Sequence, residues 1–397
     1  MTTHPPCFLI LTVGTGTAGK ESNLAAGLRN TIEMTQPRKF WLIPSTNETS
    51  TTTADLIREG FDTFVPWSDT QPYLSIENPD SLAHSRSLVR TVIAVARKQL
   101  TSQETLIVNP TSGTKQMSAG ATLAALDEGI GILHFTIGKR ADGVVITGTE
   151  QIEAFNASEY FAERDLETAR KLYQAGSLVA AASILERHPE LAAQASIAKC
   201  CHEWERQNYV EARRIASQSS SESLVRLRPH LESLAIAAKK TEADPLIVAD
   251  LLQTAEVWLS RNDTETTLTI ACRALEMGLR LALARETGLV EPYQVSQIEN
   301  LQLSIPLRER CVNPSRDGKT TILGLDNIAR ILQEKQNRIG ESYFEIRGVR
   351  ASVAIRNELM HQIRAVSSSE AQTALESISH MVEPLELPRP PHRPASL

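Results

Sequence analysis

The stretch FLILTVGTGTAGKESN, residues 8–23, decides how the first part of this chain folds. Four apolar residues followed by a glycine-rich turn are typical of a buried strand that leads into a helix. Gly14, Gly16 and Gly19 have the G-x-G-x-x-G spacing of dinucleotide-binding turns, and Lys20 nearly completes the P-loop spacing. The stretch therefore poses a choice between a dinucleotide site, a nucleoside triphosphate site, and neither.

Neither fingerprint is complete. A dinucleotide site needs a carboxylate at the end of the second strand to hold the ribose, but that strand ends in LIPSTN, residues 42–47. A P-loop needs Ser or Thr after its lysine to bind Mg²⁺, and the residue here is Glu21. What remains is a glycine-rich turn whose amides can approach an oxygen-rich ligand, with a tight turn that binds nothing as the alternative.

Short apolar runs alternate with helical patterns over the first 150 residues. This alternation predicts a parallel sheet covered by helices on both faces, an α/β domain. Strands are expected at 8–13, 40–44, 62–66, 105–109, 131–137 and 144–148, and helices at 22–34, 82–100 and 114–128.

The strand signal disappears beyond residue 150, so the rest of the chain is expected to be all-α. Residues 151–243 read as helical hairpins with a weak 31-residue repeat, although two chance amphipathic helices would give the same pattern. Asp244-Pro245 reads as an N-cap followed by proline at the first helical position, and it opens a region of long helices at 244–384. The proline-rich tail, residues 385–397, is expected to be disordered.

Composition limits the function classes. A hydrophobic content of 41% and a charged content of 22% are those of a folded soluble protein, and the net charge of −6 argues against a constitutive polyanion binder. There is no membrane-spanning apolar run, no signal segment and no C-x-x-C pair among the five cysteines. We therefore expect a cytoplasmic protein with reduced thiols, without zinc and without a membrane partner.

A second polar loop, NPTSGTKQM at residues 109–117, also follows a buried strand and opens a helix. It offers three hydroxyl groups and a glycine, and Lys115 lies in the first helical turn, where a cation opposes the helix dipole. A third polar loop occupies residues 45–49. Because the loops that follow parallel strands meet at one edge of the sheet, the three together predict a pocket for a nucleotide-like ligand without a metal.

The stretch SYFEIRGVRASVAIRNELMHQIRAV, residues 342–366, reads as a helix with an apolar stripe. The stripe consists of Ile346, Val349, Val353, Met360 and Ile363. Arg356 occupies the position that would complete it, and a charge there is costly unless it is paired or lines a cleft. Asn357 and His361 share the neighbouring face, which Arg350 and Arg364 extend.

Arginine, amide and histidine suit metal-independent RNA cleavage. A neutral histidine can take the proton of a 2′-hydroxyl, and an arginine can stabilise the charge on the phosphorus. A lone histidine on a helix is otherwise a satisfied or exposed residue. Residues five apart on one helix, such as Arg356 and His361, point about 140° away from each other. Two such helices packed across a twofold axis would bring the groups together.

The motif RNELMH, residues 356–361, resembles the R-x4–6-H signature of HEPN ribonucleases, and NPTSGTKQM resembles the conserved loop of CARF domains, the CRISPR-associated Rossmann fold. A CARF domain first, a helical segment and a HEPN domain last is similar to the auxiliary ribonucleases of type III CRISPR systems. Helix 264–286, with RALE at residues 273–276, resembles the first HEPN helix.

The resemblance implies a Rossmann-like CARF domain at 1–150, a helical-hairpin linker at 151–243 and a HEPN domain at 244–384. It implies a cytoplasmic homodimer that binds a cyclic oligoadenylate and then cuts single-stranded RNA in antiviral defence, with no cofactor and no metal. The implied catalytic residues are Arg356, Asn357 and His361. The candidate activator-binding residues are Gly14, Thr15, Gly16, Thr17, Ser45, Thr46, Asn47, Asn109, Thr111, Ser112, Gly113, Thr114, Lys115 and Gln116.

Several alternatives stay open at this point. Some CARF domains slowly cleave their activator, and Thr15, Thr111, Ser112 and Lys115 could assist in this. The chain could instead be a nucleotide-sensing scaffold without activity that binds protein partners. It could also be a small-molecule α/β enzyme, for which His84 and Asp69 are the candidate bases, although each reads better as a solvated loop residue. The ring size of the activator and the RNA preference are not encoded in any visible motif.

Overall fold

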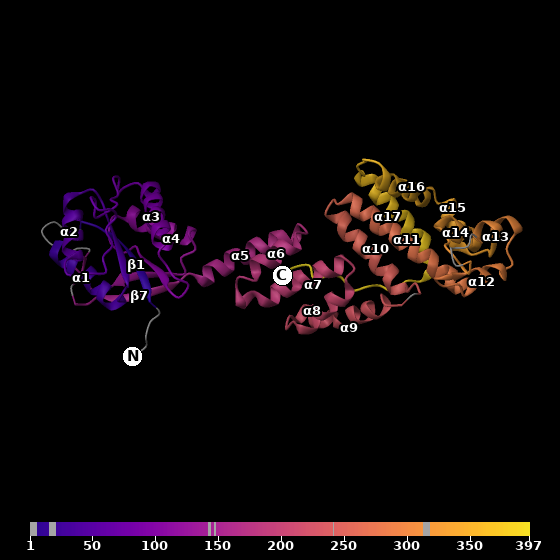
Figure 1. The fold of residues 1–397 in the computed structure, drawn as a ribbon, viewed down its shortest axis with the longest axis horizontal. Coiled ribbons are helices and arrows are strands. Elements are labelled where there is room, and N and C mark those ends of the chain that lie inside the picture. Colours follow the sequence, from indigo (N-terminus) through magenta and orange to yellow (C-terminus); the bar gives the residue numbers. More distant parts are fainter. Residues whose placement is uncertain (1–5, 16–20, 142–143, 147, 241, 313–317) are drawn as a thin grey trace. The chain divides into compact units, whose positions relative to one another are not determined.

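The computed structural model describes residues 6–15, 21–141, 144–146, 148–240, 242–312 and 318–397 (Figure 1). Its contacts divide the chain into two compact units, Met1–Arg164 and Asp165–Leu397. The boundary falls inside helix α5 (Ser158–Gln174). Each unit is a structure of its own and is described separately.

The first unit is built on a five-stranded sheet in the order β2-β1-β3-β4-β7. The first four strands in this order are parallel, as the apolar runs predict, with Ile10 opposite Trp41 on one side and Val108 on the other. Their bounds are β1 Cys7–Val13, β2 Lys39–Pro44, β3 Thr105–Asn109 and β4 Ile132–Ile137. The predicted α/β fold of this part is therefore confirmed.

Three strand predictions need correction. The fifth strand, β7 (Gln151–Asn156), pairs antiparallel with β4 although no strand is expected beyond residue 150. Its sequence QIEAFN mixes polar and apolar residues and is mostly exposed, because an edge strand with one open side needs no continuous apolar run. Residues 62–66 form no regular strand, and only an isolated bridge joins Phe64 to Phe40. The 144–148 prediction reduces to the short strands β5 (Arg140–Ala141) and β6 (Val144–Val145).

Alternate residues of β1 point to opposite faces of the sheet, and each face has its own core. Phe8 and Ile10 pack with side chains of α3 and α4, whereas Leu9 and Leu11 pack with side chains of α1 and α2. Each fully buried large apolar side chain stabilises the fold by about 1.5–3 kcal/mol. The helices are α1 Glu21–Thr35, α2 Glu48–Arg58, α3 Leu82–Arg97 and α4 Lys115–Asp127.

The second unit is mainly helical, and the sequence-based prediction of an all-α region is confirmed except for the two-residue strands β8 (Tyr293–Gln294) and β9 (Thr320–Thr321). Its first part consists of α6 Leu178–Leu185, η1 Pro189–Leu191, α7 Ala192–Glu205, α8 Tyr209–Gln218 and α9 Glu222–Ala237. Its second part consists of α10 Pro245–Ser260, α11 Thr264–Thr287, α12 Val295–Glu299, α13 Ile305–Cys311, α14 Leu325–Glu334, α15 Arg338–Glu345, α16 Arg347–His361, α17 Ser368–Val382 and η2 Glu383–Leu385.

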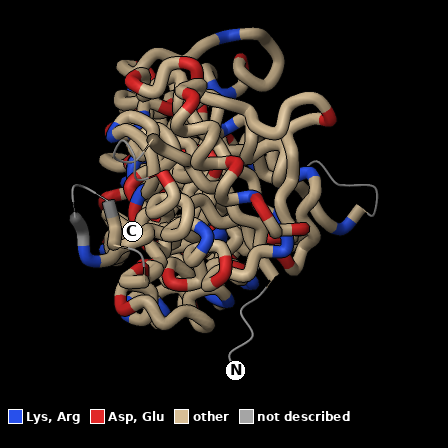
Figure 2. Tube along the Cα trace, turned by 90° about the vertical axis from the view of Figure 1, so that its left-hand side faces the viewer, with Lys and Arg blue, Asp and Glu red and all other residues tan. Residues whose placement is uncertain are grey.

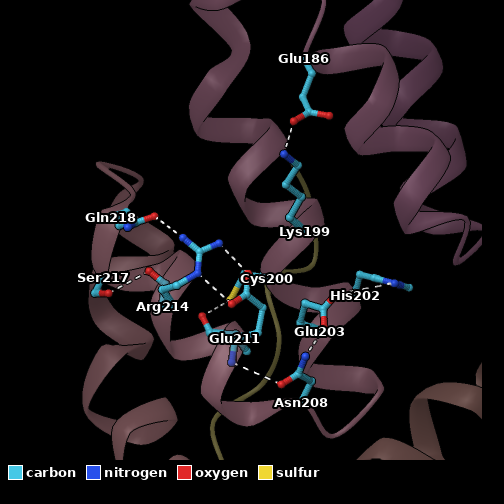
Figure 3. A network of polar contacts seen from close by, with 11 residues as sticks. Glu186, Lys199, Cys200, His202, Glu203, Asn208, Glu211, Arg214, Ser217 and Gln218 are labelled. Atoms are coloured by element: carbon cyan, nitrogen blue, oxygen red, sulfur yellow. Dashed lines mark hydrogen bonds and ion pairs between the residues drawn. The ribbon is translucent and has the colours of Figure 1, made fainter.

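The 31-residue repeat of the hairpins is a structural repeat. Gly176 and Gln207, 31 residues apart, both have left-handed backbone with φ of 81° and 63° and precede the N-cap of α6 or α8. Ala181 and Ala212 are both fully buried at equivalent positions. In the turn before α8, the side chain of Asn208 accepts a hydrogen bond from the amide of Glu211 and donates one to Glu203 (Figure 3). Chance amphipathic helices would not share this register.

Buried polar groups join the hairpins to α10. Asp250 is fully buried and accepts hydrogen bonds from Trp204 Nε1 at 2.8 Å and from the Tyr209 hydroxyl at 2.9 Å. The guanidinium of Arg261 donates two hydrogen bonds to Glu205, which is 5% exposed. Because each buried charge is paired or fully hydrogen-bonded, the cost of burying it is offset.

Residues 386–397, for which the sequence predicts disorder, contain no helix or strand and contact helices of the second unit. The Tyr173 hydroxyl donates to Pro394 O at 2.6 Å, a contact that spans 221 residues of the chain. Arg393 donates to Thr254 Oγ1 at 2.7 Å and stacks on the Trp204 ring with its guanidinium carbon 4.7 Å from the ring centroid. Proline restricts the backbone without requiring amide partners, so an irregular segment can still be held by side chains.

Charged residues of both signs are interspersed along the trace in the view of Figure 2. This agrees with the modest net charge of −6 and means that any surface for a polyanion has to be local. Within the described residues, no helix is long and apolar enough to cross a membrane.

Candidate functional site

The first candidate site lies where β1 and β3 end. The chain runs from β1 to β2 on one side and later returns to β3 on the other, so the strand order reverses between β1 and β3. Ligands of open α/β sheets bind at this reversal, outside the carboxyl ends of the strands. The glycine turn and the NPTSGTKQM loop both emerge there, as the sequence predicts.

The two loops touch each other directly. The amide of Gly14 donates to Ser112 Oγ at 3.0 Å, and Ser112 is 7% exposed. This amide is therefore committed to the neighbouring loop and does not approach a ligand freely, contrary to expectation. Thr15 is half-exposed, whereas Gly16 and Thr17 lie outside the described residues.

Most hydroxyl and amide groups of the second loop shape the loop itself. Asn109 is 1% exposed; it donates to Thr136 Oγ1 at 2.9 Å and accepts from the Thr111 amide at 3.0 Å. Thr111 Oγ1 accepts from the Thr136 amide at 2.8 Å. Thr114 caps α4 by accepting a hydrogen bond from the amide of Met117, and its hydroxyl donates to Pro79 O. The sequence reasoning missed Thr136, a polar residue in an otherwise apolar strand.

Three predicted ligand residues of this loop do reach solvent. Gly113, Lys115 and Gln116 are exposed, the last two in the first turn of α4. The amides of a first helical turn have no intrahelical acceptor, and their dipoles favour an anion. No hydrogen bond or ion pair joins the Lys115 ammonium to another described residue. An exposed glycine, a lysine and helix-terminal amides without intrahelical acceptors are groups that can bind a phosphate.

The third loop contributes less than expected. Ser45 is buried, and its amide donates to Ser50 Oγ, whose hydroxyl donates in turn to Val13 O. Asn47 is the N-cap of α2, a helix that the sequence reasoning did not predict, and accepts from the amide of Thr49. Thr46 is exposed, and its amide donates to Ile76 O at 3.0 Å.

The second candidate site is on α16. The expected continuous helix 342–366 is divided: α15 ends at Glu345, α16 begins at Arg347, and α16 ends at His361. The packed side of α16 contains the buried residues Val349 and Ser352. The backbone oxygen of Ser352 accepts a hydrogen bond from Cys272 Sγ on α11. The predicted stripe is thus buried only in its first half, because Met360 is 71% exposed and Ile363 lies beyond the helix, fully exposed.

The catalytic candidates lie at the end of α16. Arg356 is half-buried on the packed side. Burial raises the pKa of the neighbouring Cys272 thiol to about 12, and the positive charge of Arg356 opposes this shift. Arg356 Nη1 donates to Asn357 Oδ1 at 3.1 Å, and Asn357 and His361 are exposed. Arg356 and His361 therefore start from different sides of one helix, as their spacing predicts.

The other candidates have ordinary positions. Arg364 is not on the helix but forms ion pairs with Glu358 and Glu370, which hold the segment after α16. Asp69 is exposed in a loop, and His84 lies half-buried in the first turn of α3. Among the described residues, no three His, Cys, Asp or Glu side chains are grouped to hold a metal ion.

No family model and no curated protein sequence matches this chain. Among solved structures, Enterococcus italicus Csm6 bound to cyclic hexa-2′-fluoro-hexa-dAMP is similar, with a TM-score of 0.58 and 13% sequence identity. The match covers 95% of this chain and 94% of that chain. A Rossmann-like sheet followed by a helical region is therefore the shared arrangement, and this chain has the fold of a Csm6 protein over nearly its whole length.

Proposed function

We propose that this protein is a cyclic-oligoadenylate-activated, metal-independent endoribonuclease that cuts single-stranded RNA in type III CRISPR antiviral defence. The observation that carries the proposal is the R-x4-H motif at the exposed end of α16, in a chain whose fold matches Csm6 bound to a cyclic hexanucleotide. The motif supplies the reacting groups, and the sheet supplies a nucleotide-binding edge.

The activator binds at the carboxyl edge of the sheet. The exposed Lys115 and the open amides of α4 hold a phosphate, and Gly113 lets a ring approach the backbone closely. Asn109, Ser112 and Thr114 keep the loop in shape through their internal hydrogen bonds.

The reaction needs no group from outside the chain and its copy. The neutral imidazole of His361 takes the proton of a 2′-hydroxyl, whose oxygen attacks the adjacent phosphorus. The bond from phosphorus to the 5′-oxygen breaks, that oxygen takes a proton from the protonated imidazole of His361 in the second copy, and a 2′,3′-cyclic phosphate remains. Arg356 from the second copy stabilises the charge on the phosphorane oxygens, and Asn357 orients that guanidinium through its hydrogen bond.

The test is cleavage of a fluorogenic single-stranded RNA with tetra- or hexa-adenylate rings in the presence of EDTA. We expect cleavage only with the right ring, a 2′,3′-cyclic phosphate product, and resistance when the scissile sugar is 2′-deoxy. His361→Ala should abolish cleavage and keep activator affinity. A 3′-hydroxyl product or a strict need for Mg²⁺ or Mn²⁺ would overturn the assignment.

The activator site has its own test. Lys115→Ala should weaken binding of the activating ring about tenfold or more while the thermal midpoint stays within a few degrees, because the side chain is exposed. Lys98→Ala, which removes the same charge from the end of α3, is the control. Unchanged affinity of the Lys115 variant for every ring would place the activator elsewhere.

A scaffold without activity is the second reading, and one observation favours it: a single chain does not bring Arg356 and His361 to the same side of α16. A scaffold would bind the ring and cut no RNA under any condition. It would also lose nothing measurable on His361→Ala, so the RNA assay separates the two functions.

A further inference from the structure

The solvent-facing side of α16 contains a row of four residues spaced by four, three and four positions. They are Arg350, Ala354, Asn357 and His361, and all four are exposed. This spacing keeps side chains on one side of a helix. The opposite side packs on α17, where a Cβ on Gly348 would overlap Ser377. Arg350 therefore shares a surface with His361, whereas Arg356 does not.

Among the arginines of α16 and the segment after it, Arg347 and Arg350 differ from Arg356 and Arg364. Arg364 is paired with two carboxylates, and Arg356 is bonded to Asn357. No ion pair or hydrogen bond joins the Arg350 guanidinium to any other described residue. An ordered position of this long, exposed side chain therefore does not stabilise the fold. Its charge is available to a ligand.

The surface between Arg350 and His361 suits a chain of phosphates. Ala354 presents only a methyl group, so a ligand can lie close to the helix there. The row itself contains no carboxylate, and the nearby Glu358 is paired with Arg364. In a chain with a net charge of −6, a helix face with only positive and neutral groups is the kind of local surface that a polyanion needs.

We infer that Arg350 binds a phosphate of the RNA strand that flanks the scissile bond, with the strand lying along α16 from His361 over Ala354 to Arg350. The inference rests on the proposed function and gives it a strand path. Eleven residues of helix separate the two ends by about 16 Å, so the phosphate at Arg350 belongs to a nucleotide that is not being cut. Arg350 is a positioning residue and does not touch the reacting atoms.

A contact of this kind has a measurable signature. A phosphate contact is independent of base sequence and is formed equally in the ground state and the transition state. Losing it raises KM and leaves kcat unchanged. It also removes one released counterion, so the slope of log affinity against log salt concentration becomes shallower by about 0.7 for a single strand.

The experiment compares wild type with Arg350→Ala and Arg350→Lys, using the full chain, the activating ring and a fluorogenic single-stranded RNA. We expect Arg350→Ala to raise KM about three- to tenfold with kcat within twofold, and to reduce the salt slope by about 0.7. Arg350→Lys should recover much of the loss, because it keeps the charge. Arg187→Ala, an exposed arginine after α6, is the control that removes the same charge and should change neither quantity.

RNA affinity in the His361→Ala background separates this inference from the proposed function. If wild type cuts RNA, His361→Ala does not, and Arg350→Ala behaves as wild type in KM and salt slope, the strand path is wrong and the nuclease assignment stands. If no variant cuts RNA, the nuclease assignment is wrong, and binding of uncut RNA decides the inference. Equal RNA affinity with and without Arg350 would then overturn it, and a lower affinity with a shallower salt slope would support it.

Discussion

A methyl group on Gly14 would lie 2.7 Å from both the Cα and the amide nitrogen of Gly113, so the loops after β1 and β3 meet backbone to backbone. No side chain at position 14 fits this distance unless one loop moves. The contact gives Gly14 a packing role in addition to the role in a ligand turn that its spacing indicates. The two loops form one rigid edge, on which the α4 N-terminus is fixed.

The first prediction follows from the contact between Gly14 and Gly113. Gly14→Ala should destabilise the first unit by about 1–3 kcal/mol and weaken binding of the cyclic oligoadenylate, because the loops must separate to admit the methyl group. Urea denaturation and ring binding measure the two effects. Gly131→Ala is the matched control, since a Cβ there meets no atom within 4 Å. Equal stability of the two variants would show that the loops are not held as described.

The second prediction concerns the oligomer. Met360 is 71% exposed and Ile363 is fully exposed, and both are close in sequence to the candidate catalytic residue His361. We expect a homodimer in which these side chains are covered, because Arg356 and His361 do not meet within one chain. Met360→Glu should shift sedimentation toward the monomer and lower RNA cleavage in parallel. Val179→Glu changes an equally apolar exposed residue on α6 and is the control. An active monomer in the presence of the ring would contradict the proposal.

The third prediction is a pH effect at the start of α17. Glu370 accepts hydrogen bonds from the amide and hydroxyl of Ser367 and pairs with Arg364, and these contacts lower the pKa of its carboxyl group. A carboxyl group whose pKa is lower in the folded state stabilises the fold above its unfolded pKa of about 4.3, and this contribution is lost as the pH falls through the folded pKa. The stability difference between wild type and Glu370→Gln should therefore shrink below about pH 4. A difference that stays constant from neutral to acidic pH would refute the pairing.

The fourth prediction concerns the tail. Arg393→Ala should lower the free energy of unfolding of the second unit by about 1–2 kcal/mol, through loss of the bond to Thr254 and the stacking on Trp204. Denaturation followed by tryptophan fluorescence measures this change. Arg389→Ala, exposed four residues earlier, should have little effect. If the two variants are equally stable, the tail is not held by Arg393.

The sequence predicts the parallel strands well because their apolar runs are buried on both faces, as in β1. It does not predict β7, since an exposed edge strand needs no continuous apolar run, or α2, whose sequence ETSTTTADLIR is rich in threonine, a weak helix former. In the candidate site, the sequence indicates which loops end at the sheet edge but not which of their polar groups bond to each other there. Ser112 and Asn109 look like ligand groups in sequence, and only the fold shows that Gly14 and Thr136 occupy them.

The contact between Tyr173 and Pro394 has a consequence for how the second unit is made during protein synthesis. Synthesis proceeds from the N-terminal side, and domains generally fold as units while the chain grows. A growing chain that stops before Arg393 has the hairpins and α10 in place but leaves the ring of Trp204 without its cation. The hairpins therefore cannot reach their final packing in the order in which they are translated. Their last contacts wait for about 190 further residues, and such long-range closure is slow.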